Sequence, residues 1–220
     1  TLFIINELVV IQMKIDKETY KLSEDNYIRI GSRKQRIVLG NTFSTDMRHF
    51  IGWNNRWFGK YTKTATYTIS INGEIYEHFS PKYYSNFLND IEISEGTISI
   101  LLENEGWLIR DLFEKNLFVN YVGDIYNREG TVFDKKWRKY RFWAPYTKKQ
   151  LESVSELVKK LCDEFDIPLK VVTHNTNFDD VKYFHGILYK SNFEKYYTDV
   201  SPAWFFKEFK NKIEKNEKND

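Results

Sequence analysis

The sequence is poor in the residues that build covalent or metal frameworks. Cys162 is its single cysteine, and it contains four histidines in 220 residues. One cysteine excludes an intramolecular disulfide framework and a zinc site built from cysteines. Because Cys162 lies near the end of a predicted amphipathic helix, we expect its thiol to be buried and unreactive.

The chain also lacks long apolar runs. No run approaches the roughly 20 residues needed to cross a bilayer. Its first residues, TLFIINELVVIQMKID, lack the basic start and small-residue cleavage site of a signal peptide. These features predict that the protein has no membrane partner. They also predict that it remains in the cytoplasm of the producing cell or in a virus particle.

Net charge is small, because 33 Lys and Arg face 31 Asp and Glu, which leaves +2. A global attraction to nucleic acid is therefore not expected. Residues 135–143, KKWRKYRFW, combine cations with aromatic rings, as single-strand nucleic-acid grooves and sugar-binding faces do. On one extended strand these cations would be divided between two faces, so we expect a mixed surface strand and no nucleic-acid partner.

What the sequence does contain is enough apolar material for a folded core. Hydrophobic residues make up 41% and charged residues 29% of the chain, proportions typical of soluble globular proteins. The 17% aromatic content is high enough that some rings are expected at the surface. Apolar periodicity predicts strands at 8–15, 20–22, 27–30, 37–39, 66–71, 74–79, 97–103, 169–173 and 186–189, and helices at 45–60, 147–165 and 203–213.

Local signals mark the ends of several of these elements. Asn72-Gly73 between two alternating runs predicts a hairpin with a type I′ turn. Thr147 and Gln150 predict a capping box at the start of the long helix. Ser44 or Thr45, with Asp46 in the first turn, is expected to cap the helix at 45–60, and Ser201-Pro202 is expected to start the last helix. The fold class is therefore α/β or α+β, with a mixed central sheet flanked by helices.

The order of motifs resembles one known family. The chain reads YIRIGSRKQRIVLGNT, ATYTISINGEIYEHF, TISILLENEG, APYTKKQLESVSELVKKLCDEFDIP, HGILYKSNF and YYTDVSPAW. This order resembles the type-2 N-acetylmuramoyl-L-alanine amidases, the zinc enzymes of phage lysins, muropeptide amidases and peptidoglycan-recognition proteins. The resemblance implies an amidase-like domain over 27–220 with an aromatic and basic insertion at about 107–146, preceded by an N-terminal strand extension at 1–26.

The resemblance also implies that the zinc ligands have been lost. The family's first His position falls on Gly40 or its neighbour Asn41, and the second falls on Lys190. Only the third ligand position, Asp199, keeps a carboxylate. Catalytic zinc requires three side-chain donors, and a lysine ammonium would repel the ion. No metal cofactor is therefore expected, and Gly40, Lys190 and Asp199 are the vestigial ligand positions.

Other positions that the family uses are altered as well. An acid-base position falls on Leu101, a family lysine falls on Tyr197, and a family His is replaced near Asn86. Tyr67 matches the tyrosine that phage-lysin relatives use. The resemblance therefore implies no catalytic residue, with Tyr67 and Asp199 as remnants. It implies an inherited binding groove of Asn41, Tyr67, Asn86, Leu101, Lys190, Tyr197 and Asp199.

These changes predict a catalytically inactive, phage-encoded pseudoenzyme that acts as an endolysin-like, virion-associated binding module. Its partner is expected to be a peptidoglycan fragment or a protein. An active amidase with a rearranged zinc site remains open, with His49, His78, His174 or His185 brought near Asp199. Near the groove, Trp57 is equally compatible with sugar stacking and with core packing.

Overall fold

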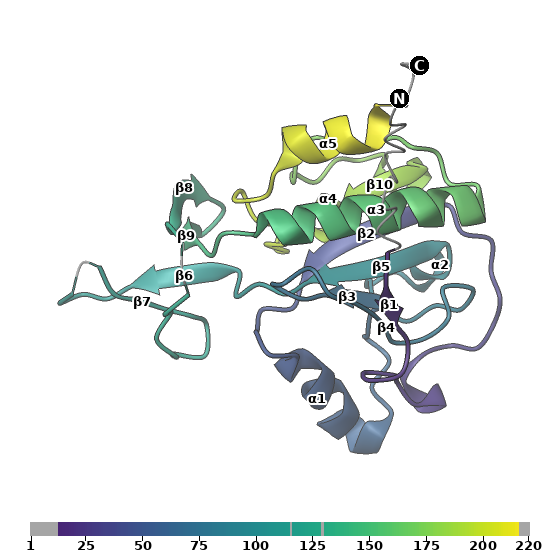
Figure 1. The fold of residues 1–220 in the computed structure, drawn as a ribbon, viewed down its shortest axis with the longest axis horizontal. Helices are drawn as coiled ribbons and strands as arrows, with labels where there is room; N and C mark the ends of the chain where they lie inside the picture. Colours follow the sequence, from purple (N-terminus) through teal and green to yellow (C-terminus); the bar gives the residue numbers. More distant parts are fainter. Residues whose placement is uncertain (1–12, 115, 129, 216–220) are drawn as a thin grey trace, which may run out of the picture.

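The core is a mixed six-stranded sheet (Figure 1). A computed structural model describes residues 13–114, 116–128 and 130–215. The strand order is β1-β4-β3-β5-β2-β10. The strands are β1 (Ile15–Asp16), β2 (Arg36–Asn41), β3 (Tyr67–Ile69), β4 (Ile75–Glu77), β5 (Thr97–Leu102) and β10 (Gly186–Tyr189). The expected mixed sheet with flanking helices is confirmed.

Strands β2 and β5 lie at the centre of the sheet. Every residue of both strands is buried, as expected for strands covered on both faces. β10, β2, β5 and β3 run parallel, whereas β3 and β4 form an antiparallel hairpin. The carboxyl ends of the parallel strands therefore meet at one edge of the sheet, where ligand sites of such sheets commonly lie.

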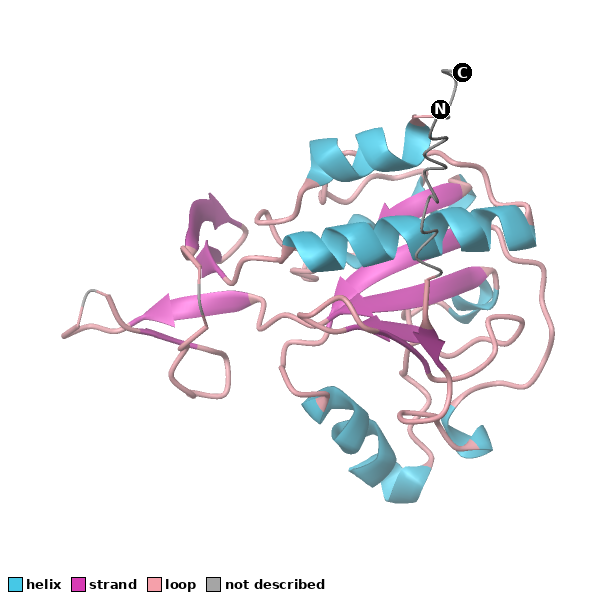
Figure 2. Cartoon of the chain, in the orientation of Figure 1, coloured by secondary structure: helices cyan, strands magenta, loops and turns pink. Residues whose placement is uncertain are grey.

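Helices cover both faces of this sheet (Figure 2). On one face lies α3 (Lys148–Phe165), with α5 (Phe206–Glu214) packed against it. The other face is covered by α1 (Arg48–Asn55), which continues into the 3₁₀ turn η2 (Arg56–Gly59). The short elements are η1 (Glu24–Asn26), α2 (Ile91–Glu95), η3 (Val181–Tyr183) and α4 (Lys190–Phe193). Among the described residues, the helices are all too short or too polar to cross a bilayer.

Local capping decided where α3 begins. Thr147 Oγ1 accepts a hydrogen bond from Gln150 N at 3.1 Å, and Gln150 Oε1 accepts from Thr147 N at 3.1 Å. The predicted capping box is confirmed. The other two predicted helix starts are wrong. Met47, in a left-handed conformation, precedes α1 without a side-chain cap, and α5 begins at Phe206.

The predicted hairpin is confirmed, but its turn type is wrong. Gly73 N donates to Ser70 O at 2.9 Å and has φ +85°, whereas Asn72 is not in the left-handed region. This is a three-residue loop with glycine in the left-handed position. Gly73 also packs against α3, where an added Cβ would lie 2.8 Å from Ser153 Oγ. The helix therefore restricts the turn.

Three predicted strands are wrong, and a fourth lies mostly outside the described residues. Residues 20–22 form no strand, 27–30 form a single bridge from Ile28 to Tyr84, and 169–173 form one from Val171 to Ile187. Of the predicted strand at 8–15, residues 8–12 are not described, and β1 begins at Ile15. These short apolar runs lie in loops and do not pair along their length.

Four strands between residues 107 and 143 form a second sheet that projects from the core (Figure 1). We call this sheet and its loops the arm. Its strands are β6 (Trp107–Arg110), β7 (Phe118–Val119), β8 (Phe133–Trp137) and β9 (Tyr140–Trp143), in the order β7-β6-β9-β8. The predicted single strand over 135–143 is wrong, because the chain reverses at Arg138, which has φ +54°. The alternation of faces expected there is therefore also wrong.

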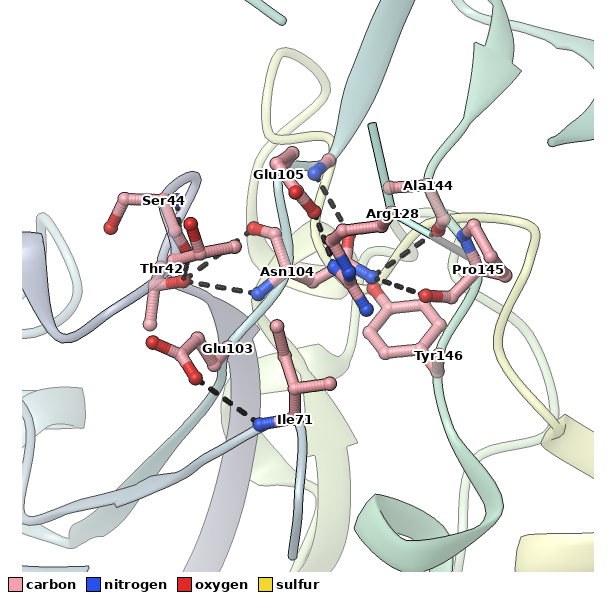
Figure 3. Close-up of polar contacts among 12 residues, drawn as sticks. Thr42, Ser44, Ile71, Glu103, Asn104, Glu105, Arg128, Ala144, Pro145 and Tyr146 are labelled. Atoms are coloured by element: carbon pink, nitrogen blue, oxygen red, sulfur yellow. Dashed lines mark hydrogen bonds and ion pairs between the residues drawn. The ribbon is translucent and has the colours of Figure 1, made fainter. Parts of the chain in front are cut away.

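A buried polar junction connects the arm to the core (Figure 3). Asn104 Nδ2 donates to the carbonyl oxygens of Ala144 and Pro145 at 3.2 and 3.1 Å, and its Oδ1 accepts from Gly106 N at 2.7 Å. Nearby, Glu105 pairs with Arg128. Because buried polar groups are costly when they are unpaired, this network restricts how the arm meets the sheet.

Candidate functional site

Gly40 and Asp199 meet at the carboxyl edge of the sheet. A Cβ built on Gly40 would lie 2.7 Å from Asp199 Oδ2 and 3.1 Å from Leu101 Cδ2. Asn41 N donates to Asp199 Oδ2 at 3.1 Å. Only 2% of Asp199 is exposed. The carboxyl end of β2 and the loop before α5 therefore come together, as the motif order implied.

Lys190 joins the same cluster from the end of β10. Its Nζ lies 4.5 Å from the ring centroid of Phe87 and 4.8 Å from that of Tyr197. The same Phe87 ring lies next to Gly40, with its Cζ 3.3 Å from a Cβ built on the glycine. Lys190 and Gly40 therefore contact one ring, which places the lysine at the vestigial site. Gly40, Asn41, Leu101, Lys190, Tyr197 and Asp199 are thus brought together, and we call them the Asp199 cluster.

Lys190 and Asp199 influence each other through burial and charge. In the described part of the chain they form no ion pair within 4.0 Å; the Asn41 N–H instead occupies an Asp199 oxygen. A direct ion pair at this position is therefore not present. Burial raises the pKa of Asp199 and lowers the pKa of Lys190, and the attraction between the two groups opposes both shifts.

Arg138 is a residue of this region that the sequence analysis missed. From the turn between β8 and β9, its guanidinium donates to the carbonyl oxygens of Ser191 at 3.1 Å and Glu194 at 2.9 Å, and to that of Tyr197. The arm therefore holds the loop between Lys190 and Asp199. The basic and aromatic composition of 135–143 was visible in the sequence, but the turn that aims Arg138 was not.

A second buried tie to the Asp199 cluster comes from Tyr146. Its hydroxyl donates to Asn41 Oδ1 at 2.6 Å and accepts from Ser201 N at 3.1 Å. Tyr146 thereby links β2 to the residues that follow Asp199. Burial raises the pKa of its phenol, so the hydroxyl keeps its proton at neutral pH.

Replacing Tyr146 with Phe is expected to lower the free energy of unfolding by about 1–3 kcal/mol, because two buried polar groups lose their partner. The measurement is chemical denaturation. Tyr126→Phe is the matched control, since the Tyr126 hydroxyl is buried without a partner in the described structure. An equal loss of stability in both variants would contradict the proposed role of the Tyr146 hydrogen bonds.

Two other residues predicted for the groove bond to partners outside the Asp199 cluster. The Tyr67 hydroxyl donates to Glu77 Oε2 at 2.9 Å, and with Leu157 it lines a small pocket under α3. Its neighbour Thr68 faces the opposite side of the sheet, because successive strand residues alternate. Asn86 Nδ2 donates to Thr62 Oγ1 at 2.9 Å. Phe87, one residue on, reaches the Asp199 cluster instead. Tyr67 therefore faces α3 and not the Asp199 cluster, and the assignment of Asn86 to the groove stays a prediction.

None of the histidines is placed as a replacement ligand beside Asp199. His49 and His78 both contact Thr68 Oγ1, through Nε2 atoms at 3.0 and 2.8 Å. His174 Nδ1 lies 2.8 Å from Thr176 Oγ1, and His185 is exposed. Within 13–114, 116–128 and 130–215, three or more His, Cys, Asp or Glu side chains never gather as a metal site would require.

The contacts of His49 and His78 fix where their protons lie. His78 Nδ1 is 2.7 Å from Tyr20 O, and a carbonyl oxygen only accepts, so Nδ1 carries the proton. Burial lowers the pKa of His78 to about 4 and that of His49 to about 3, so both rings are neutral at pH 7. His78 Nε2 then accepts from the Thr68 hydroxyl, whose oxygen accepts from His49 Nε2–H.

Trp57 is exposed, so the core-packing interpretation is wrong for it. It is 64% accessible, and its ring centroid lies 5.3 Å from that of Tyr61. The Arg56 guanidinium lies over the Tyr61 ring, with its Cζ 5.1 Å from the ring centroid. The Trp57 ring is therefore exposed at the end of α1, where it could stack on a ligand.

The residues at the vestigial ligand positions do not fit a zinc ion. Gly40 has no donor atom, Lys190 presents a cation, and one Asp199 oxygen is occupied by the Asn41 N–H. Zinc in catalytic sites is held by three side-chain donors with a fourth position open. A single carboxylate beside an ammonium lacks that donor set.

Comparison with known proteins shows similarity of fold without similarity of sequence. No protein-family model matches the chain, and no curated protein matches it in sequence. Two similar solved structures are N-acetylmuramoyl-L-alanine amidases of Clostridium intestinale URNW. LysC has 13% identity over 91% of this chain and 97% of its own, with a TM-score of 0.50. The endolysin amidase LysCS has 14% identity over 91% and 95%, with a TM-score of 0.51. Drosophila PGRP-LB has 12% identity over 94% and 98%, with a TM-score of 0.52.

Proposed function

We propose, from the fold that this chain shares with N-acetylmuramoyl-L-alanine amidases and a peptidoglycan recognition protein, that it is a catalytically inactive binding module for peptidoglycan fragments. The observation that supports inactivity is the Asp199 cluster. At two of the three positions where the family has a metal ligand, this cluster has a glycine without a side chain, Gly40, and a cation, Lys190. Without a metal, the site has no Lewis acid to polarise an amide carbonyl and none to generate hydroxide at neutral pH.

Binding is supported by the groups that remain in the cluster. The Lys190 ammonium is held between two rings and suits a ligand carboxylate or carbonyl. The Phe87 and Tyr197 rings provide apolar surface beside it. The likeness to an endolysin amidase supports a phage origin and a virion-associated role, which form part of the same proposal.

The test starts with protein purified without chelators. We expect elemental analysis to find zinc far below one ion per chain, and we expect no release of muropeptides from purified cell walls. The double variant Gly40→His/Lys190→His supplies two imidazoles beside Asp199. The Asp199 carboxylate must shift to admit them, because a Cβ at Gly40 would lie 2.7 Å from its Oδ2, and the variant should then bind more zinc than wild type. Stoichiometric zinc in the wild-type protein, together with chelator-sensitive wall lysis, would establish an active amidase instead.

Binding is measured on insoluble peptidoglycan with the same preparation. Wild type should be retained, and Lys190→Met should weaken retention about tenfold or more, since hydrogen bonds to charged groups contribute about 1.5–3 kcal/mol. Lys182→Met, which removes an exposed lysine near β10, is the control. Failure of wild type to bind would refute the peptidoglycan ligand. A protein co-purifying with that non-binding chain would then favour a protein partner.

A further inference from the structure

A hollow of about 380 Å³ lies between the arm and the loop that precedes Asp199. We call it the arm hollow. Its lining comes from the β8–β9 turn and from the segment after α4, two parts of the chain far apart in sequence. The lining residues are Arg138, Lys139, Tyr140, Lys195, Tyr196 and Thr198. Its volume is within the range of about 300–1,000 Å³ typical of small-molecule sites.

Both walls of the arm hollow are held in place before any ligand arrives. Tyr140 stacks on Trp107 with ring centroids 4.3 Å apart and planes 10° apart. The Tyr196 hydroxyl accepts a hydrogen bond from Asn89 Nδ2 at 2.6 Å. Arg138 joins the two walls through its bonds to Ser191, Glu194 and Tyr197. Such preorganisation reduces the entropy that a ligand must lose on binding.

The charge of the arm hollow is positive. Arg138 uses its guanidinium on backbone carbonyls, which leaves its charge uncancelled by a direct ion pair. Lys139 and Lys195 are exposed, and in the described ranges neither forms an ion pair within 4.0 Å. Glu194 lies in the loop without pairing with either lysine. Asp199 is buried behind the wall, where Lys190 is the nearby charge that acts on it most strongly. Two free ammonium groups beside two tyrosine rings suit an anion carried on a ring.

We propose that the arm hollow binds an acidic sugar, with Lys139 and Lys195 contacting its phosphate or carboxylate and Tyr140 and Tyr196 packing on its ring. Charge complementarity specifies the anion, and the limited volume of about 380 Å³ favours one compact unit over an extended strand. A single-stranded nucleic acid needs a basic groove that follows its backbone, whereas the cations here converge on one hollow. The proposal does not depend on peptidoglycan binding, because it uses neither Lys190 nor Asp199.

The test is titration of the full chain with glucose 1-phosphate, glucuronic acid and glucose, followed by NMR. We expect at least one of the two acidic sugars to bind at least tenfold more tightly than glucose, and the stronger of the two identifies the anion. Lys139→Ala/Lys195→Ala should weaken that binding at least tenfold. Lys135→Ala/Lys136→Ala removes the same charge from β8, outside the hollow, and should leave binding unchanged.

Three results would overturn the proposal. They are equal affinity for glucose and the acidic sugars, equal loss in the two double variants, and binding of an oligothymidylate in place of the sugars. The four lysines are exposed, so both double variants should unfold at the wild-type temperature. If Lys139→Ala/Lys195→Ala abolishes sugar binding while retention on peptidoglycan persists, the two sites act separately.

Discussion

Lowering the pH from 7.5 to 4.5 is expected to reduce the free energy of unfolding by about 4 kcal/mol through two buried histidines alone. His78 is fully buried and His49 is largely buried, and the described structure places neither beside a carboxylate partner. Their neighbours are Thr68, Tyr20 and the rings of Phe50 and Trp53. Such a site solvates an imidazolium poorly, so both rings stay neutral in the folded protein.

The direction follows from the pKa values. Burial lowers the pKa of His78 to about 4 and of His49 to about 3, below the ordinary value of 6.5. In the unfolded chain both rings take up protons as the pH falls below about 6.5, whereas in the folded protein they do not. Their stabilisation is therefore complete above 6.5 and is lost as the pH falls toward 4. Each histidine accounts for roughly 2 kcal/mol of the change.

Two isosteric variants isolate this effect by urea denaturation at several pH values. His49→Gln keeps a donor near the Nε2 position, and His78→Asn keeps one near Nδ1. Each should reduce the average slope of stability against pH between 6.5 and 4.5 by about 1 kcal/mol per pH unit. His185→Gln, which alters an exposed histidine, should leave the slope unchanged. Asp199, whose pKa burial raises, contributes in the opposite sense in all variants, so unchanged slopes in His49→Gln and His78→Asn would contradict the neutral pair.

Replacing Arg138 with Ala is expected to lower the free energy of unfolding by about 3 kcal/mol. The variant removes the donors to three backbone carbonyls. Hydrogen bonds to charged groups contribute about 1.5–3 kcal/mol each when buried, and because Arg138 is only half-buried, the three together are expected to contribute about as much as one or two such bonds. It also removes the stacking of the guanidinium on Trp137, at 4.5 Å from the ring centroid. Arg138 has a left-handed backbone conformation. Alanine also carries a Cβ and meets the same steric restriction there, so the turn itself should persist.

Arg141→Ala provides the matched comparison, because it removes an arginine of the same arm. Arg141 pairs with Asp134 at 2.6 Å, but both side chains are exposed, and exposed ion pairs contribute about 0–1 kcal/mol. Chemical denaturation of both variants measures the difference. A loss for Arg138→Ala no larger than for Arg141→Ala would show that the arm does not hold the loop before Asp199. Amide exchange at residues 191–197 should also rise in Arg138→Ala alone.

Several features of the chain could be predicted from local signals. The capping box at Thr147 needs only residues within one helical turn, and the near-continuous apolar run of β5 indicates a strand covered on both sides. The order of motifs also identified Gly40, Lys190 and Asp199 as neighbours, and they do converge. That inference depended on resemblance, because the three residues are separated by many positions in the chain.

The errors have a common physical origin. Tyr67 was assigned to the groove by its place in a motif, but a shift of one strand residue reverses its face, and the hydroxyl pairs with Glu77 beneath α3. The turn at Gly73 was assigned from Asn-Gly, but packing on α3 restricts its conformation. In both cases a contact with an element distant in sequence selected among conformations that were locally acceptable.

The sequence by itself determined the strand and helix periods, the start of α3 and the absence of histidine at two of the three vestigial ligand positions, since each is a property of residue type or of nearby residues. Tertiary structure alone decided which side chains share a face. It placed the Arg138 guanidinium against the loop before Asp199 and the Thr68 hydroxyl between two neutral histidines. It also brought together the two walls of the arm hollow. These depend on register, turn geometry and exclusion of water, which arise only when distant segments pack together.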